Sequence, residues 1–279
     1  MATEGAELMH LTQFICFELG RECNLGHLHA KCPNTHPDRY KHVDTSQAMS
    51  DETIVDTAVA LIQEHGFRGL IGFHYYNEPT LEMERMWRVA ARIRTKETSA
   101  KFVLWTNGTY APPPYVDVVW SLSLFDEIHV TKYEQSKSLP GSPLAEKSGR
   151  FVHQWPFDDR LSTTGDEPGR PEFDAPCCRM FTEMIFDYYG NVHLCCYDWR
   201  GLGTTLNVHK HSLSRIIGRW QAIRENLSGG IMTHRTDGPV PIVCRSCTAP
   251  GRNTGITDFV KAPAEAARAY RQEVLNRGK

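Results

Sequence analysis

The first half of the sequence alternates short apolar runs with amphipathic segments, and this alternation restricts the folds open to the chain. The apolar runs are rich in β-branched and aromatic residues, as strands are, and they cover residues 12–19, 70–76, 101–105 and, more weakly, 127–131. Segments with a helical spacing of apolar residues lie between them. Strands separated by helices pair in parallel, so the sequence predicts an α/β protein with a full or partial β/α barrel.

The helical segments have recognisable ends. One helix is expected to begin at Ser50, ahead of two acidic residues, and to end at Gly66. A second is expected over residues 81–94. Three prolines at 112–114 precede a third, which reaches about Phe125. Each helix follows a strand, as a β/α barrel requires.

Composition and charge narrow the class of protein. With 279 residues, of which 41% are hydrophobic, the chain can bury a full core. Its net charge of −2 offers no broad basic surface for nucleic acid or acidic lipid. It contains neither a run of about eighteen apolar residues nor an N-terminal signal pattern, so we expect a cytoplasmic protein without a membrane partner. Nine cysteines in such a chain favour metal ligands and buried thiols over disulfides.

The second half of the sequence has a different texture. Residues 158–176 are rich in Asp, Gly, Pro and Thr and predict a linker. Residues 182–199 predict a β-hairpin that turns at Gly190 and places Cys195 on its second strand. Further helices are expected over 212–227 and 262–277. We therefore expect four parts: a partial barrel over 10–157, the linker over 158–176, a small hairpin-plus-helix domain over 177–256, and a C-terminal helix over 257–279.

Four cysteines in the second half of the chain have the spacing of a metal site. Cys178 is followed after eleven residues by Gly190 and after four more by Cys195, and Cys244 and Cys247 complete the set. Four soft sulfur ligands suit either zinc or an iron–sulfur cluster. Spacing alone leaves both metals open.

Two segments at the ends of predicted strands, taken together with these cysteines, resemble the radical S-adenosylmethionine (SAM) enzymes that carry a SPASM or Twitch extension. Residues 72–79, which end in Glu78 and Pro79, are similar to the glycine-glycine-glutamate-proline segment of that family, and residues 105–108 to its Thr-Asn-Gly turn. Both segments lie at carboxyl ends of strands, where a barrel binds its ligands. The resemblance covers most of the chain and favours iron–sulfur over zinc. In length, in the segment of residues 72–79 and in the cysteine segment it extends to 2-deoxy-scyllo-inosamine dehydrogenases.

The resemblance implies cofactors, a partner and the residues that hold them. The cofactors are S-adenosyl-L-methionine and two 4Fe-4S clusters, and the partner is an external electron donor such as flavodoxin or ferredoxin. The glutamate segment of the family holds the methionyl amino group of SAM. The residues expected at SAM are Tyr76, Asn77, Glu78, Thr106 and Asn107. The residues expected at the auxiliary cluster are Cys178, Cys195, Cys244 and Cys247.

The segment expected to bind the first cluster departs from the family pattern. The family has Cys-x3-Cys-x2-Cys, and here Cys23 and Cys32 fit the two ends. His27 keeps the three-residue gap after Cys23, and His29 keeps the two-residue gap before Cys32. A histidine ligand would raise the potential of the cluster and so oppose reductive cleavage of SAM. Cys16 is another candidate thiolate, with a buried strand cysteine as its alternative, and a third possibility is that no redox-active cluster forms.

Each motif also has a purely structural explanation. Glu78 with Pro79 suits the start of a helix, and residues 106–108 suit a generic turn. Cys177 and Cys196 adjoin expected ligands and are expected to be packing residues. The order of several such segments along one chain is what favours the family.

The activity implied by the resemblance is a radical oxidation. A 5′-deoxyadenosyl radical takes a hydrogen atom from a substrate between the barrel and the Twitch unit, and the auxiliary cluster accepts an electron after a base removes the hydroxyl proton. Asp198, which follows Cys195 closely, is a candidate for that base, with a solvated turn residue as its alternative. Lys132 is a candidate to bind the cofactor or the substrate.

The expected substrate is a small polar metabolite, such as a sugar or cyclitol. The inosamine dehydrogenase has an arginine before a glycine pair where this chain has residues 162–165, so its amino sugar is not the expected substrate. Two other functions fit the sequence. One is a radical SAM epimerase or bond-forming enzyme acting on a small molecule or peptide, and the other is a non-catalytic metal-binding scaffold with a degenerate first cluster.

Overall fold

A single sheet organises the part of the chain that the structure describes. The structure is a computed structural model, and it describes residues 9, 12–28, 32–109, 124–133, 152–155 and 182–230; for residues 28, 132, 152–155 and 225–230 it describes the backbone alone. The sheet has seven strands in the order β5-β4-β3-β2-β1-β6-β7. The strands are β1 (Phe14–Phe17), β2 (Leu70–Gly72), β3 (Lys101–Thr106), β4 (Glu127–Tyr133), β5 (Val152–Trp155), β6 (Glu183–Phe186) and β7 (Val192–His193).

Neighbouring strands from β5 to β6 pair in parallel, and the β6–β7 pair is antiparallel. The four strands predicted in the first half are present, and the α/β architecture is confirmed. β2 ends at Gly72, earlier than the apolar run over residues 70–76 suggests, and residues 73–78 continue as a loop.

The strand β1 lies where the chain order of the sheet reverses. It pairs with β2 on one side and β6 on the other, with Cys16 aligned to both Gly72 and Ile185. In open α/β sheets ligands bind at such a point, beyond the carboxyl ends of the strands. β6 belongs to the segment predicted to form the small domain, so the sheet continues past the boundary that the sequence predicts at residue 157. The domain boundaries themselves stay predictions.

The helices start where the sequence indicates. α2 (Asp51–Gln63) is capped by Ser50, whose side chain accepts a hydrogen bond from Thr53 N at 3.1 Å. α3 (Met83–Lys96) follows the 3₁₀ turn η3 (Pro79–Glu82), so it begins two residues later than predicted. The remaining described helices are α8 (Leu213–Gly230), η1 (Gly26–Leu28) and η2 (Pro33–Thr35). The helices predicted before Phe125 and over 262–277, and the linker, lie outside the described residues.

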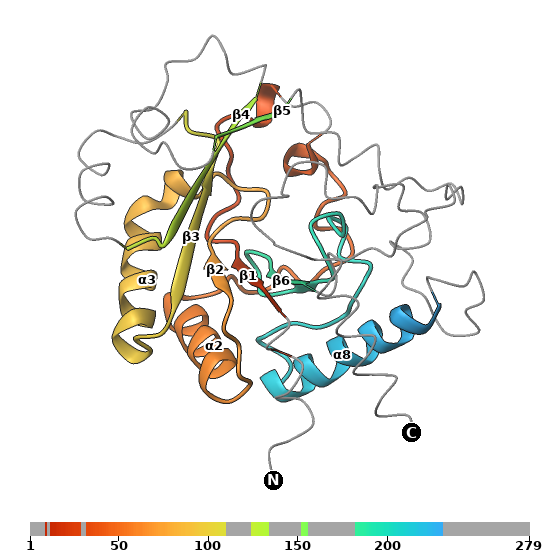
Figure 1. Cartoon of the computed structure of the whole chain (residues 1–279). Helices are drawn as coiled ribbons and strands as arrows, with labels where there is room; N and C mark the ends of the chain where they lie inside the picture. The colour runs from red at the N-terminus through yellow and green to blue at the C-terminus, as the bar shows by residue number, and fades with distance from the viewer. Residues whose placement is uncertain are drawn as a thin grey trace.

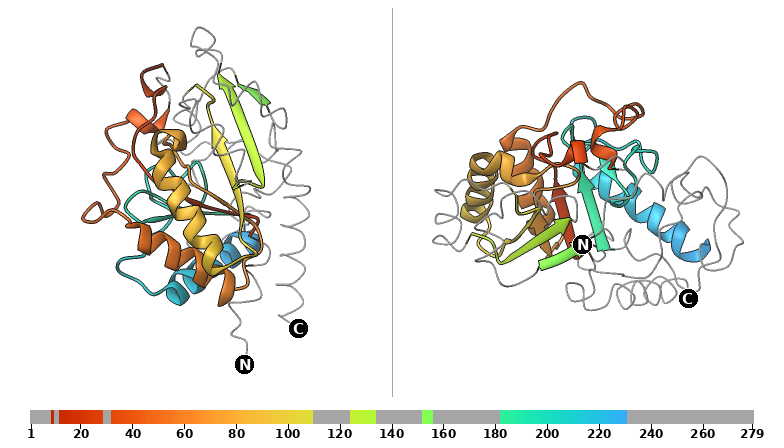
Figure 2. Two further views of the ribbon diagram at one scale, coloured as in Figure 1. Left: turned by 90° about the vertical axis from the view of Figure 1, so that its left-hand side faces the viewer. Right: turned by 90° about the horizontal axis from the view of Figure 1, so that it is seen from above.

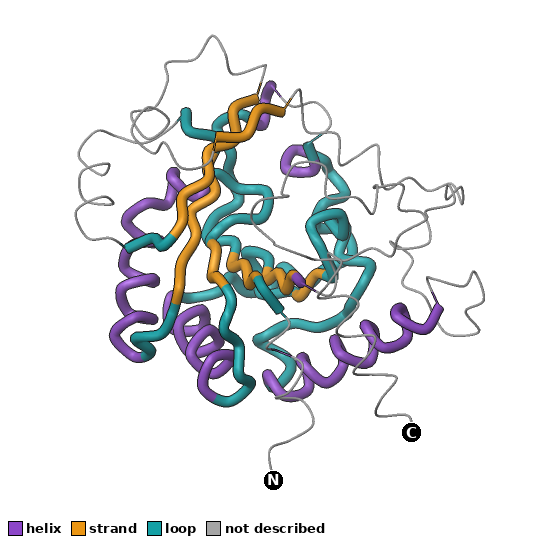
Figure 3. Tube along the Cα trace, in the orientation of Figure 1, coloured by secondary structure: helices purple, strands orange, loops and turns teal. Residues whose placement is uncertain are grey.

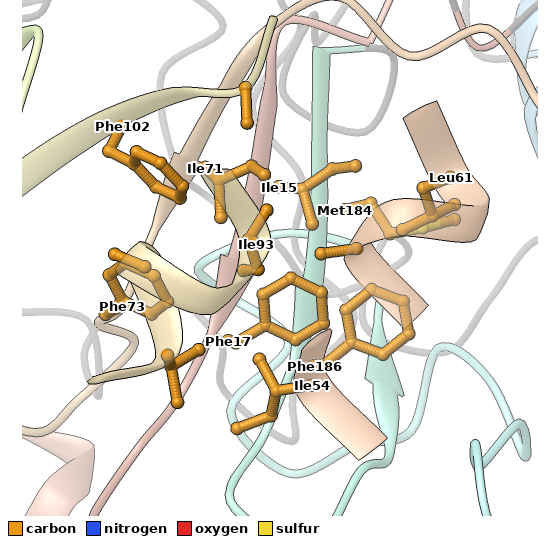
Figure 4. Close-up of a cluster of buried hydrophobic side chains, with 14 of the residues drawn as sticks. Ile15, Phe17, Ile54, Leu61, Ile71, Phe73, Ile93, Phe102, Met184 and Phe186 are labelled. Atoms are coloured by element: carbon orange, nitrogen blue, oxygen red, sulfur yellow. The ribbon is translucent and has the colours of Figure 1, made fainter. Parts of the chain in front are cut away.

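The hydrophobic core lies between the sheet and the helices. α2 and α3 lie together on one side of the strands (Figures 1 and 2), and α8 adds Ile216, Ile217 and Trp220 to the same core. Alternate strand residues point toward these helices, as the period of two requires. Figure 4 shows members of this cluster from strands, helices and the loop after β2: Ile15, Phe17, Ile54, Leu61, Ile71, Phe73, Ile93, Phe102, Met184 and Phe186.

The predicted hairpin forms, with one correction. Gly190, at φ 77°, occupies the turn between β6 and β7; L side chains rarely adopt this conformation. Cys195 was expected on the second strand, and this is wrong: β7 ends at His193, and Cys195 lies in the loop that follows. The strand ends there because Leu194 N donates to the side chain of Asp198 instead of extending the strand ladder.

Phe186→Ala tests the packing of the core. Phe186 is fully buried and stacks on Phe17 with 5.0 Å between ring centroids, so its truncation should lower the free energy of unfolding by about 3–5 kcal/mol. Phe14→Ala, on the opposite face of β1 and half-buried, is the control and should cost less. Urea denaturation measures both, and equal losses would contradict this assignment of the two faces.

Candidate cofactor site at the carboxyl ends of the strands

Hydrogen bonds join three loops at the carboxyl ends of β1, β2 and β3. Glu78, in the loop after β2, accepts from Thr106 Oγ1 at 2.6 Å and from Asn107 N at 2.8 Å, both at the end of β3. Its own backbone N–H donates to Glu22 O at 2.8 Å, in the loop after β1. The structure therefore brings together residues that the sequence predicts from separate segments. The segments after β1 and β2 are largely loop (Figure 3).

The loop that carries Cys23 is fixed to the end of β3. Asn107 Nδ2 donates to Asn24 Oδ1 at 2.8 Å and lies 3.9 Å from Cys23 Sγ. Asn24 Nδ2 donates in turn to Thr109 Oγ1 at 2.8 Å. Asn107 thus contacts both the Glu78 carboxylate and the neighbourhood of Cys23.

The carboxyl group of Glu78 is buried, and the described residues leave part of its hydrogen-bonding capacity unused. It is 2% exposed, and burial raises its pKa above the usual value even though hydrogen bonds from Asn107, Thr106 and Thr80 oppose the shift. Oε1 accepts from Thr106 and from both the N–H and the hydroxyl of Thr80, whereas Oε2 accepts from Asn107 N. A carboxylate oxygen has two lone pairs, so Oε2 has room for one more donor. An ammonium group there would offset the cost of burying the charge, so this group fits the amino group of SAM.

Cys23 and Cys32, the two thiols predicted to bind the first cluster, both lie in the described part of the chain. Cys23 is half-buried and Cys32 buried, while His27 is exposed. η1 packs closely against η2: a Cβ added to Gly26 would lie only 3.1 Å from Thr35 Cγ2. The segments after Cys23 and after Cys32 are therefore adjacent. Two thiolates fit an iron–sulfur cluster, and the remaining ligand stays a prediction.

Only some of the predicted metal ligands lie in the described part of the chain. In the described ranges, no three His, Cys, Asp or Glu side chains gather closely enough to hold a metal ion. His29, Cys178, Cys244 and Cys247 lie outside those ranges. Of the auxiliary set only Cys195 is described, and it is buried.

Cys16 has the surroundings of a buried strand cysteine. It is 1% exposed, its Sγ donates to His74 O, and it lies 3.5 Å from His74 Nδ1. Burial raises the pKa of this thiol well above its usual value, and the nearby carboxylates of Glu183 and Glu18 raise it further. A high pKa disfavours the thiolate that binds iron. The structure thus favours the strand alternative over cluster ligation.

Asp198 closes the loop of residues 194–203, which we call the Cys195 loop. Its carboxylate is fully buried and accepts from the backbone N–H groups of Leu194, Leu202 and Gly203. Burial raises its pKa, while His193 and these N–H groups oppose the shift. It is therefore not a solvated turn residue, and the geometry gives it a structural role. Its function as a base stays a prediction.

His193 connects the Cys195 loop to the hairpin. Its Nε2 lies 3.1 Å from Asp187 Oδ2, and its Nδ1 lies 2.6 Å from Asp198 O. Although burial opposes the charged imidazole, the Asp187 carboxylate raises the pKa of His193 above its usual value. The loop is thereby held by polar contacts inside the protein.

The face of the sheet opposite the core carries aromatic and imidazole rings that the sequence analysis missed. Trp105 contacts Phe14, His74 and His129 with ring centroids 5.2, 5.0 and 4.8 Å apart. Phe14, Trp105 and His129 alternate with core residues along their strands, so the period of two could have identified them, whereas His74 lies in the loop after β2. Lys132 lies on β4, and its side chain is outside the described part of the structure.

A buried ion pair was also missed. Glu18, directly after β1, pairs with Arg39, and their side chains are 0% and 2% exposed. Glu18 also accepts from Tyr76 N at 3.0 Å and from Tyr188 N at 3.1 Å. No local pattern marks Glu18 or Arg39, because the pairing depends on the tertiary fold.

Gly203→Ala tests the closure of the Cys195 loop. A Cβ there would lie 2.5 Å from both Asp198 Oδ2 and Leu194 Cδ1, so the free energy of unfolding should fall by about 1–3 kcal/mol. Gly218→Ala, in α8 with no atom within 4 Å of its added Cβ, should instead raise it by about 0.5–1 kcal/mol. Thermal or urea denaturation checks both variants. Unchanged stability in Gly203→Ala would contradict the close approach.

The pH dependence of Glu78→Gln tests the burial of the carboxyl group. A raised pKa makes the native state bind a proton that the unfolded chain releases near its usual pKa of about 4.3. The stability of the wild type relative to Glu78→Gln should therefore be greatest below that pH and fall as the pH rises through the raised pKa. Urea titrations from pH 4 to 8 measure the difference. A difference that grows with pH would show that the hydrogen bonds outweigh burial.

Comparison with solved structures identifies proteins that share this fold. No family model matches the chain, and no curated protein is significantly similar in sequence. The crystal structure of BtrN in complex with AdoMet and 2-DOIA superposes with a TM-score of 0.58 at 17% identity, covering 85% of this chain and 92% of that chain. BtrN in an open conformation gives 0.54 at 18% identity, with the same coverage. The chain therefore shares the fold of BtrN, a partial α/β barrel, and the fold that the sequence resemblance implies is confirmed.

Proposed function

We propose that the chain is a radical SAM oxidoreductase that oxidises a small polar metabolite such as a sugar or cyclitol. The observation that carries the proposal is the network that joins Glu78, Asn107 and the loop of Cys23 at the carboxyl ends of three parallel strands. This edge of the sheet is where α/β folds bind ligands. BtrN, which shares the fold, was crystallised with AdoMet and 2-DOIA.

The residues of this chain would hold the cofactors as follows. Cys23 and Cys32, with His27 or His29, would hold the first cluster, and Glu78 Oε2 would accept a hydrogen bond from the amino group of SAM. When bound, the first cluster and SAM together would supply a 5′-deoxyadenosyl radical for hydrogen abstraction. The proposed auxiliary cluster, which would accept the electron from the substrate, would be held by Cys195 together with Cys178, Cys244 and Cys247. A flavodoxin or ferredoxin would be the partner that supplies electrons.

The substrate would lie against the face of the sheet opposite the core. Trp105 and His74 are half-buried there, and the backbone of Lys132 lies on the same sheet at β4. Aromatic rings offer a flat apolar surface to a sugar or cyclitol ring, and imidazoles offer hydrogen bonds to its hydroxyl groups. These surroundings support a small, neutral and polar substrate over a long peptide.

One observation favours a second candidate, a non-catalytic metal-binding scaffold. The first motif supplies two thiolates where the family supplies three. A radical epimerase or bond-forming enzyme would keep the cofactors and differ in its product. Iron content and SAM cleavage separate the scaffold from the enzymes, and product analysis separates the enzymes from each other.

The experiment is anaerobic reconstitution followed by iron counting and an assay for 5′-deoxyadenosine with dithionite as reductant. The wild type should bind about eight irons, as two 4Fe-4S clusters require, and cleave SAM. Of His27→Ala and His29→Ala, one should lose about four irons and the cleavage activity. Cys16→Ala should keep both, because the Cys16 thiol is buried on β1. His42→Ala, also an exposed histidine, is the matched control for His27→Ala and should keep both.

The opposite outcome is equally specific. About four irons, or a single zinc, with no SAM cleavage in the wild type would exclude the radical mechanism and support the scaffold. Loss of cleavage in Cys16→Ala with His27→Ala and His29→Ala unaffected would assign the third ligand to Cys16.

A further inference from the structure

Tyr76 connects the segment expected to bind SAM with the Cys195 loop. It lies two residues before Glu78 in the loop after β2, and its hydroxyl donates to the backbone carbonyl of Cys196. Cys196 directly follows Cys195 in the loop after β7. One side-chain hydrogen bond therefore joins two segments that are far apart in the sequence and that the proposed function assigns to different cofactors.

The end of this connection at Tyr76 is held rigidly. Tyr76 N donates to Glu18 Oε1 at 3.0 Å, and Glu18 pairs with Arg39. The guanidinium carbon of Arg39 lies 5.0 Å from the centroid of the Tyr76 ring. The centroids of the Tyr75 and Tyr76 rings lie 4.1 Å apart. The side chain is 3% exposed. With its backbone and ring both held, the hydroxyl has little freedom to leave Cys196.

The other end is held as well. Asp198 N donates to Cys195 O at 3.0 Å, and the Asp198 carboxylate accepts from Leu194 N. The Cys196 carbonyl thus belongs to a short turn whose shape is fixed internally. Tyr76 consequently acts on the turn as a unit and not on a single flexible residue.

We propose that Tyr76 is a positioning residue that sets where the Cys195 loop stands relative to the Glu78 segment. The contact is a property of the polypeptide, whereas its consequence for an auxiliary cluster rests on the proposed function. Removing the hydroxyl takes this donor away from the Cys196 carbonyl and lets the Cys195 ligand shift relative to the SAM segment. A shift of that kind changes the hydrogen bonding and solvent exposure around the auxiliary cluster, which set its reduction potential.

The test compares Tyr76→Phe with Tyr75→Phe. Tyr75 is the neighbouring residue, and its buried hydroxyl has no hydrogen-bond partner in the described part of the chain, so it is a matched control for loss of one phenolic oxygen. Hydrogen–deuterium exchange of the metal-free protein is measured over residues 194–200. Tyr76→Phe should speed exchange there by about 3- to 10-fold, as expected for the loss of one hydrogen bond, while Tyr75→Phe leaves it unchanged.

A second readout uses the reconstituted protein. At unchanged iron content, Tyr76→Phe should shift the reduction potential and the electron paramagnetic resonance signal of the auxiliary cluster, and Tyr75→Phe should not. Tyr76→4-aminophenylalanine, which restores a donor at the same position, should return both the exchange rates and the signal toward those of the wild type.

Several outcomes overturn the proposal. These are wild-type exchange in Tyr76→Phe, the same acceleration in Tyr75→Phe, a uniform acceleration over the whole chain, and failure of Tyr76→Phe to fold, which would make the hydroxyl a general stability element. A wild type that binds no iron and cleaves no SAM would refute the proposed function. The exchange comparison would still decide the role of Tyr76.

Discussion

The buried ion pair of Glu18 and Arg39 is the interaction on which the described site depends. Glu18 stands at the carboxyl end of β1, the strand where the order of the sheet reverses, and it receives N–H groups from Tyr76 after β2 and Tyr188 after β6. Three chain segments thus converge on one carboxylate. Leaving either charge of such a pair unpartnered typically costs about 3–5 kcal/mol, so these segments are held to a single arrangement.

The two faces of the sheet carry different kinds of side chain. The face toward α2 and α3 is apolar, and burial of each large side chain there contributes about 1.5–3 kcal/mol. The opposite face carries rings that contact one another, such as Trp105 and His129. Because strand residues alternate between faces, residues such as Phe102 and Trp105 serve different faces of the same strand. Substitutions on the second face should therefore leave the core intact.

Local pattern predicts much of this architecture. The four strands of the first half, the cap at Ser50 and the turn at Gly190 follow from spacing and backbone chemistry. The meeting of Glu78 with Thr106 could also be anticipated, because carboxyl ends of parallel strands share an edge. What sequence could not give depends on contacts across the fold. Asp198 looked like a turn residue near a ligand, and only the tertiary structure shows that backbone N–H groups enclose it.

The position of β1 between β2 and β6 has a consequence for how the chain folds during synthesis. Phe14 pairs with Leu70, which emerges early, and with Glu183, which emerges only after most of the chain has been made. Until then one side of the central strand exposes unpaired N–H and C=O groups, a surface prone to aggregation. Pairings so distant in sequence also close slowly. The N-terminal half alone would therefore be an incomplete folding unit, because its strand β1 would lack its partner β6.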